Sequence, residues 1–224
     1  MFELYLDTTD IVQLTRFNKA LPLKGITTNP TILAKSGRGL KENLKLCAEI
    51  LGTEARFHVQ TISKSTADII KEAEQLYNLP YDIVVKIPAT EIGIAAIKQL
   101  NNTPIKVLAT AIYSVQQGFL AGLAGADYLA PYVNRIETMG TNGIAVVADI
   151  QLLIKQHNLK SVLLPASFKN THQVIEILKL GVGSITLPPD VTDQLFGHPT
   201  VQPAVNQFEN DWKKIFDNKL SYET

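Results

Sequence analysis

Eight short apolar runs, separated by longer stretches with helical periodicity, constrain the fold of this chain more than any other feature. The runs lie at 3–7, 24–28, 56–60, 82–87, 106–111, 128–132, 161–167 and 184–187. Strands of a parallel sheet that is covered on both faces show such runs, and a helix is the usual connection between them. Eight such repeats in 224 residues predict an α/β fold, a single (β/α)8 TIM barrel, with a doubly wound open sheet as the alternative.

One further helix is predicted beyond the eighth run. No Pro/Gly-rich linker divides the chain, so we assign residues 1–224 to one barrel domain with an additional C-terminal helix over 200–218. Apolar side chains fall near one face of this helix, namely Val205, Phe208, Trp212, Ile215 and Phe216. Such a face indicates burial against something. It either covers the floor of the barrel or docks on a neighbouring subunit.

The charge balance limits the partners of this chain. Lys plus Arg equals Asp plus Glu at 21 each, so no bulk field attracts nucleic acid or an anionic membrane. No apolar stretch approaches the ~18 residues of a membrane span, and the N-terminus lacks the basic and apolar regions of a signal peptide. The single Cys47 excludes an intrachain disulfide and is typical of a reducing compartment. We therefore expect a cytoplasmic location and no nucleic-acid or membrane partner.

Lys86 is the main candidate for chemistry, because it lies inside an apolar, β-branched run at 83–88, IVVKIP. Burying an unpaired ammonium costs on the order of several kcal/mol, so such a lysine loses its proton or finds a partner. A neutral, desolvated lysine is a nucleophile for carbonyl carbon and forms Schiff bases. The alternative is a lysine at a strand end whose ammonium reaches water.

Besides Lys86 on the fourth predicted strand, polar side chains stand at or just after the ends of six others. They are Asp7, Thr27, Asn29, Gln60, Thr110, Tyr132, Arg135 and Ser167. The C-terminal strand ends of a barrel meet at one mouth, where active sites of this fold are built. Strand alternation groups Lys86 with Val84, so that Lys86 points into the barrel if Val85 and its neighbours lie under the helices. Individually, Asn29, Thr110 and Ser167 could equally be helix caps or turn residues.

The histidines give no metal signal. His58, His157, His172 and His198 are scattered, with no paired spacing on one element, so we expect neither a catalytic metal nor another cofactor. His58 lies on a predicted strand and could serve as a ligand or a base, but we favour a core histidine whose ring nitrogens are hydrogen-bonded.

Four segments resemble the transaldolase family. The segment 25–33, GITTNPTIL, resembles the first signature of that family, and 83–90, IVVKIPAT, resembles the second, which contains its Schiff-base lysine. The segments 124–136, AGADYLAPYVNRI, and 165–169, PASFK, match as well. The length is similar to the small subfamily of fructose-6-phosphate aldolases and short transaldolases. The resemblance implies a barrel that assembles as a homodecamer, with the C-terminal helix reaching a neighbour.

Three positions bear on the activity that the resemblance implies. Gln60, Leu108 and Tyr132 resemble the aldolase pattern, whereas transaldolases typically carry Glu, Asn and Phe there. The implied activity is cleavage of fructose 6-phosphate to dihydroxyacetone and glyceraldehyde 3-phosphate through an iminium on Lys86. The alternatives are a transaldolase of the pentose phosphate pathway with erythrose 4-phosphate as acceptor, a Schiff-base aldolase for another sugar, and a non-catalytic sugar-phosphate-binding barrel.

The resemblance also assigns catalytic roles. Asp7 would orient substrate hydroxyls, assist proton transfer and stabilise the cationic intermediate. Gln60, Thr110 and Tyr132 would hold a water that shuttles protons. The Tyr132 phenol would carry the proton, because an amide cannot act as the base.

The remaining candidates are predicted to bind substrate. Asn29 would bind hydroxyls near C1 or C3, with Thr27 supporting it, while Arg135 and Ser167 would hold the phosphate. As a nearby cation, Arg135 is also expected to lower the pKa of Lys86.

Overall fold

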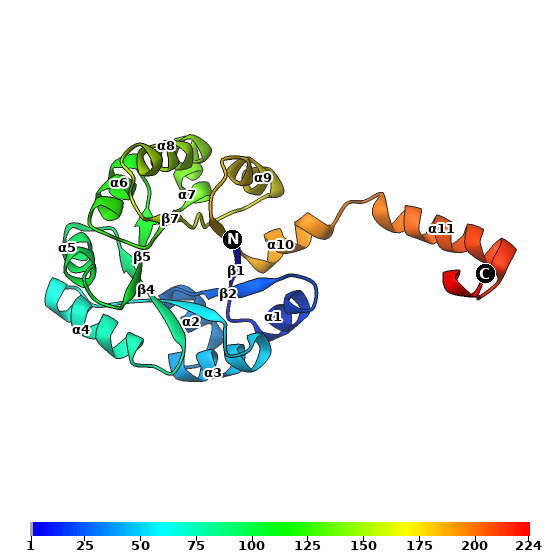
Figure 1. The fold of residues 1–224 in the computed structure, drawn as a ribbon, viewed down its shortest axis with the longest axis horizontal. Helices are drawn as coiled ribbons and strands as arrows, with labels where there is room; N and C mark the ends of the chain where they lie inside the picture. The colour runs from blue at the N-terminus through cyan, green and yellow to red at the C-terminus, as the bar shows by residue number, and fades with distance from the viewer. Residues whose placement is uncertain (1) are drawn as a thin grey trace.

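Eight parallel strands form one sheet whose two edges meet. The computed structural model describes residues 2–224, and Figure 1 shows the helices surrounding the strands. The strands are β1 (Glu3–Asp7), β2 (Leu23–Thr27), β3 (Arg56–Gln60), β4 (Asp82–Pro88), β5 (Lys106–Ile112), β6 (Tyr128–Pro131), β7 (Val162–Leu163) and β8 (Ser184–Leu187). They neighbour one another in chain order, with β8 beside β1. The Thr186 amide donates to the Pro165 carbonyl at 3.1 Å and joins the two edges, which confirms the predicted barrel.

One or more helices follow each strand along the chain. They are α1 (Ile11–Asn18), α2 (Pro30–Ser36), α3 (Leu40–Leu51), α4 (Thr66–Tyr77), α5 (Glu91–Leu100), α6 (Val115–Leu123), α7 (Val133–Thr138), α8 (Gly143–Gln156), α9 (Thr171–Lys179), α10 (Pro189–Phe196) and α11 (Val201–Phe216), followed by the short 3₁₀ helix Ser221–Glu223. Side-chain caps fix several starts: Ser65, for example, accepts from the Asp68 amide at the start of α4, which satisfies an otherwise free helix donor.

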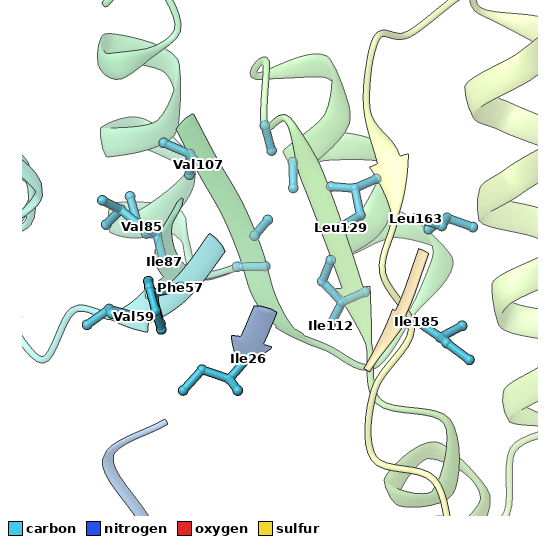
Figure 2. Packing of buried hydrophobic residues seen from close by; sticks show 14 of the residues in the cluster. Ile26, Phe57, Val59, Val85, Ile87, Val107, Ile112, Leu129, Leu163 and Ile185 are labelled. Carbon is cyan, nitrogen blue, oxygen red and sulfur yellow. The ribbon is translucent and has the colours of Figure 1, made fainter. Parts of the chain in front are cut away.

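The core consists of two layers that follow the strand alternation. Ile83, Val85 and Ile87 of β4 belong to the large cluster between strands and helices, and Figure 2 shows the equivalent side chains of other strands. Val84 belongs to a separate cluster inside the barrel, whose members are Tyr5, Val84, Leu108, Tyr128, Ala130 and Leu164. The predicted alternation is therefore confirmed, and Lys86 has the inward parity of Val84.

Side chains close the N-terminal end of the barrel. The Arg56 guanidinium donates to Glu3 at 3.0 Å, to Asp82 at 2.8 Å and to the Tyr128 hydroxyl at 2.6 Å. Tyr5 and Tyr128 each donate to the same Glu3 oxygen. The Arg56 charge is therefore both ion-paired and hydrogen-bonded, which offsets the cost of burying it. This polar network closes the floor of the barrel.

The seventh strand is shorter than predicted. The interval 161–167 was expected to be a strand, but only Val162–Leu163 is regular, with an isolated bridge between Tyr132 and Ala166. Pro165 has no amide hydrogen to donate to a ladder, and Ser167 has a φ of +61°. The segment nevertheless remains in the barrel wall, since the Leu164 and Ala166 amides donate to carbonyls of the β6 segment.

The C-terminal helix extends away from the barrel. α11 spans Val201–Phe216, as predicted, and Figure 1 shows it well separated from the strands. Phe208 and Ile215 are 71% and 74% exposed. The alternative in which this helix covers the barrel floor is therefore wrong. Within residues 2–224, no helix has both the length and the apolar character needed to cross a bilayer.

Candidate active site

Lys86 lies inside the barrel near the C-terminal mouth. Its side chain is on β4, the residue is 5% exposed, and Nζ donates to the Thr28 carbonyl at 2.6 Å. Burial lowers the pKa of Lys86 below its ordinary value, and the Asp7 carboxylate acts in the opposite direction. The expectation that Arg135 lowers this pKa is wrong: desolvation supplies the shift. A less basic amine of this kind is the nucleophile that imine chemistry needs.

A chain of hydroxyls holds Asp7. Thr27 donates to an Asp7 carboxylate oxygen at 2.7 Å and lies 2.7 Å from the Thr186 hydroxyl. Thr27 has a single hydroxyl proton, which goes to Asp7, so Thr186 donates to Thr27. This arrangement fixes the carboxylate beside Lys86. Thr186 was not among the predicted residues, although a polar residue of inward parity on an apolar strand was a usable signal.

Thr110 and Tyr132 form a second polar pair. Their hydroxyl oxygens are 2.8 Å apart and both residues are buried. Burial raises the pKa of Tyr132, while the bond to Thr110 acts against this. Ala111 follows with a φ of +54°, where the pairing of β5 with β6 is irregular. Gln60 stands opposite Lys86 in the ladder of β3 and β4, so that the ends of four successive strands, β3 to β6, contribute to this side of the mouth.

Arg135 reaches the mouth through two tyrosines. Its guanidinium carbon lies 4.9 Å from the centre of the Tyr132 ring, and one of its nitrogens donates to the Tyr113 hydroxyl at 3.3 Å. The rings of Tyr113 and Tyr132 pack edge to face at 5.6 Å. A cation over an aromatic face is held in place while its remaining donors stay available. Tyr113 was not among the predicted residues, although it directly follows β5.

Asn29 and Ser167 have structural contacts of their own. The Asn29 side-chain oxygen accepts from the Ile32 amide at 2.9 Å and caps α2, which leaves its NH₂ group free for other contacts. Ser167 adopts a positive φ that costs a non-glycine residue about 1–2 kcal/mol. Its carbonyl accepts from the Asn134 amide at 2.8 Å, which ties the β7 segment to α7. Both residues lie at the mouth, and their backbone roles do not use every polar group.

His58 differs from its predicted environment. It is buried inside the barrel at 0% exposure, and neither ring nitrogen has a hydrogen-bond partner within residues 2–224. Burial lowers the pKa of His58 well below its ordinary value, with further contributions from Lys86 and Arg56. The predicted core position is therefore confirmed, but no protein group within residues 2–224 supplies the expected hydrogen bonds. The residue is a neutral imidazole that the surrounding side chains do not satisfy.

A cleft opens beside Asp7. It has a volume of about 440 Å³, and its lining includes Asp7, Asp10, Ile32, Lys35, Ser36 and Arg38. Asp7 is the only predicted site residue on its wall. The cleft carries charges of both signs, so it offers room next to the carboxylate without a net preference for anions. Over residues 2–224, no group of three His, Cys, Asp or Glu side chains is arranged to hold a metal ion.

Together these contacts provide a desolvated amine, a fixed carboxylate, a buried pair of hydroxyls and a guanidinium at the rim. A solved structure titled "Flavocytochrome B2, ARG289LYS mutant" is similar with a TM-score of 0.60 and 11% identity, over 84% of this chain and 56% of that chain. The chain thus spans about half the length of that protein, and the likeness concerns the fold alone. The family model described as "Transaldolase/Fructose-6-phosphate aldolase" matches residues 4–224. The protein belongs to the transaldolase/fructose-6-phosphate aldolase family.

Proposed function

We propose that the protein is a Schiff-base aldolase that cleaves fructose 6-phosphate reversibly to dihydroxyacetone and glyceraldehyde 3-phosphate. The observation that carries the proposal is the buried Lys86 amine with its lowered pKa, beside the Asp7 carboxylate. A barrel that only bound sugar phosphates would gain nothing from a desolvated amine at its centre, since burying it costs stability.

In the proposed reaction, the Lys86 amine attacks the C2 carbonyl of the sugar, and loss of water gives an iminium. The iminium accepts the electrons of the C3–C4 bond while the C4 hydroxyl loses its proton, so that glyceraldehyde 3-phosphate leaves. The remaining enamine is protonated at C3. Water then adds to the new iminium and releases dihydroxyacetone together with the free amine.

The roles of the surrounding groups follow from their contacts. Asp7, held by Thr27, takes up the hydroxyl proton and stabilises the cationic intermediate. Tyr132, bonded to Thr110 at 2.8 Å, passes a proton to the enamine through a water also held by Gln60. Arg135 and Ser167 bind the phosphate, and the free NH₂ group of Asn29 binds sugar hydroxyls.

The residues near Lys86 favour an aldolase over a transaldolase. A transaldolase keeps its enamine from being protonated until an acceptor aldehyde arrives. Here the buried Tyr132 hydroxyl, bonded to Thr110, would provide a proton carrier, and Gln60, which pairs with Lys86 in the ladder, contributes an amide in place of a carboxylate. The same reasoning requires no metal and no other cofactor.

The decisive experiment is release of glyceraldehyde 3-phosphate from fructose 6-phosphate, with and without erythrose 4-phosphate. Multiple turnovers without the acceptor are expected. Turnover only in its presence would make the protein a transaldolase, and the argument from Gln60 and Tyr132 would fail. Cleavage of other sugar phosphates but not of fructose 6-phosphate would replace the substrate and keep the chemistry.

We also propose a homo-oligomer, a decamer by family resemblance, in which α11 docks on a neighbouring subunit. Support comes from the exposed apolar side chains of a helix that leaves its own barrel (Figure 1). An apolar helix face of this kind gains stability only when another surface covers it. The cytoplasmic location stays a prediction.

A further inference from the structure

His58 is a buried polar group that the proposed reaction does not use. It lies on β3 with inward parity, paired in the ladder with Thr27 on one side and Val84 on the other. Gln60 and Lys86 form the next inward pair toward the mouth. The imidazole therefore occupies the layer directly beneath the reactive amine.

The polar groups below His58 form hydrogen bonds with other residues. Its ring packs edge to face against Tyr5 at 4.7 Å and Tyr128 at 5.4 Å. Both tyrosine hydroxyls donate to Glu3 in the barrel floor, and therefore point away from the imidazole. Their rings hold the imidazole in place but offer it no strong hydrogen bond.

A neutral imidazole has one donor and one acceptor nitrogen. Leaving both unsatisfied in a buried site costs more than the net gain of a typical hydrogen bond. Buried polar groups without a protein partner are usually satisfied by ordered water. His58 and Lys86 are diagonal neighbours on adjacent strands, and the charge of Lys86 contributes to the lowered pKa of His58, so the two inward groups lie near each other. One water spans about 5.5 Å between two hydrogen-bonded atoms.

We propose that His58 binds an internal water between its ring and the Lys86 amine, and through this water is a positioning residue for the lysine. The Thr28 carbonyl, just after β2, already accepts one hydrogen bond from the amine, and the water would accept a second one. His58 thus gives the amine a polar neighbour without adding a countercharge. The inference about the lysine's reactivity rests on the proposed Schiff-base function; the water site does not.

The consequence is a defined effect on the ionisation of Lys86. A hydrogen-bonded water stabilises the ammonium more than the neutral amine. Removing it therefore lowers the pKa of Lys86 further. The other charged or titratable groups around this pair are Asp7, Tyr5 and Glu3 on β1, Arg56 on β3, Asp82 on β4, and Tyr128 and Tyr132 at β6. None of them changes in the variants below.

The test combines a crystal structure of the full chain with the pH dependence of borohydride trapping by dihydroxyacetone. Electron density for a water at hydrogen-bond distance from both a His58 ring nitrogen and Lys86 Nζ is expected. A crystal structure in which the imidazole is hydrogen-bonded directly to a protein group, or is surrounded only by carbon atoms, would overturn the proposal.

For trapping, His58→Phe keeps the ring shape and removes both nitrogens. In the plot of trapping rate against pH, the acid limb is the range in which the rate falls because Lys86 becomes protonated. For this variant the limb is expected to move about one pH unit toward lower pH, as for loss of one hydrogen bond to a charged group. His58→Gln, which can bind a water, is expected to restore the wild-type limb. Leu164→Met repacks the same interior layer and is expected to leave the limb in place.

The outcomes separate the two proposals. If folded His58→Phe shows the same acid limb of trapping as the wild type, the positioning role is refuted. It is also refuted if the acid limb of His58→Gln is shifted as far as that of His58→Phe. If His58→Phe does not fold, His58→Asn replaces it in the comparison with the wild type. Its shorter amide does not reach the water beside Lys86, so its acid limb is expected to shift, and an unshifted limb refutes the positioning role. A wild-type protein that traps no dihydroxyacetone refutes the aldolase, while the electron density still decides the water site.

Discussion

Replacing Thr27 by valine removes a single hydroxyl that serves both Asp7 and Thr186. Thr27 is fully buried, and its two hydrogen bonds are each 2.7 Å long. Valine has nearly the same shape, so the change creates no cavity. It leaves a carboxylate oxygen and the Thr186 hydroxyl without their present partner.

The expected loss of stability follows from these two bonds. Loss of the bond to the half-buried carboxylate costs about 1.5 kcal/mol and loss of the bond between hydroxyls about 1 kcal/mol, so the free energy of unfolding falls by roughly 2–3 kcal/mol. With a urea m-value of roughly 2–3 kcal/mol per molar, the midpoint falls by about 1 M. Cleavage slows as well, because Asp7 loses the contact that orients it.

Urea unfolding at a fixed protein concentration measures this effect, since an oligomer's stability depends on concentration. Thr27→Ser keeps the hydroxyl and is the matched control, expected to stay closer to wild type in both midpoint and kcat. A valine variant with the wild-type midpoint and rate would show that the hydroxyl chain neither stabilises the barrel mouth nor positions Asp7.

Three further predictions concern the lysine, the phenol and the C-terminal helix. Lys86 has a lower pKa in the folded state than its ordinary 10.5, so the wild type gains stability as pH rises through that window. Urea unfolding is therefore expected to give Lys86→Met a larger free energy of unfolding than the wild type at neutral pH. The difference shrinks toward pH 10.5, and a difference that does not change with pH would contradict the burial argument. Tyr132→Phe lowers kcat more than it changes KM, because it removes the proton carrier; an unchanged kcat would exclude Tyr132. Replacing Phe208 and Ile215 by aspartate lowers the mass measured by light scattering, and an unchanged oligomer would place the interface elsewhere.

Much of the barrel was predictable because strand alternation and helical periodicity are local properties of the chain. The inward parity of Lys86 followed from its apolar neighbours, and the convergence of Asp7, Thr110 and Tyr132 followed from barrel geometry. The irregular seventh strand was not found, since Pro165 and the positive φ of Ser167 interrupt an otherwise apolar run.

Contacts that depend on the register between strands could not be predicted from the sequence. The floor network around Arg56 joins β1, β3, β4 and β6, and no spacing along the chain reveals that these strands align there. The same holds for His58, whose lack of partners reflects tyrosines that turn their hydroxyls toward Glu3. The sequence also left open where α11 lies, because an apolar face does not identify the surface that covers it.

Reduction with borohydride in the presence of dihydroxyacetone, followed by mass analysis of the peptides, tests most directly whether Lys86 is the nucleophile. The account predicts one stable adduct, on the peptide that contains Lys86, and none in Lys86→Met. An adduct on another lysine, or one that persists in Lys86→Met, would contradict the central claim.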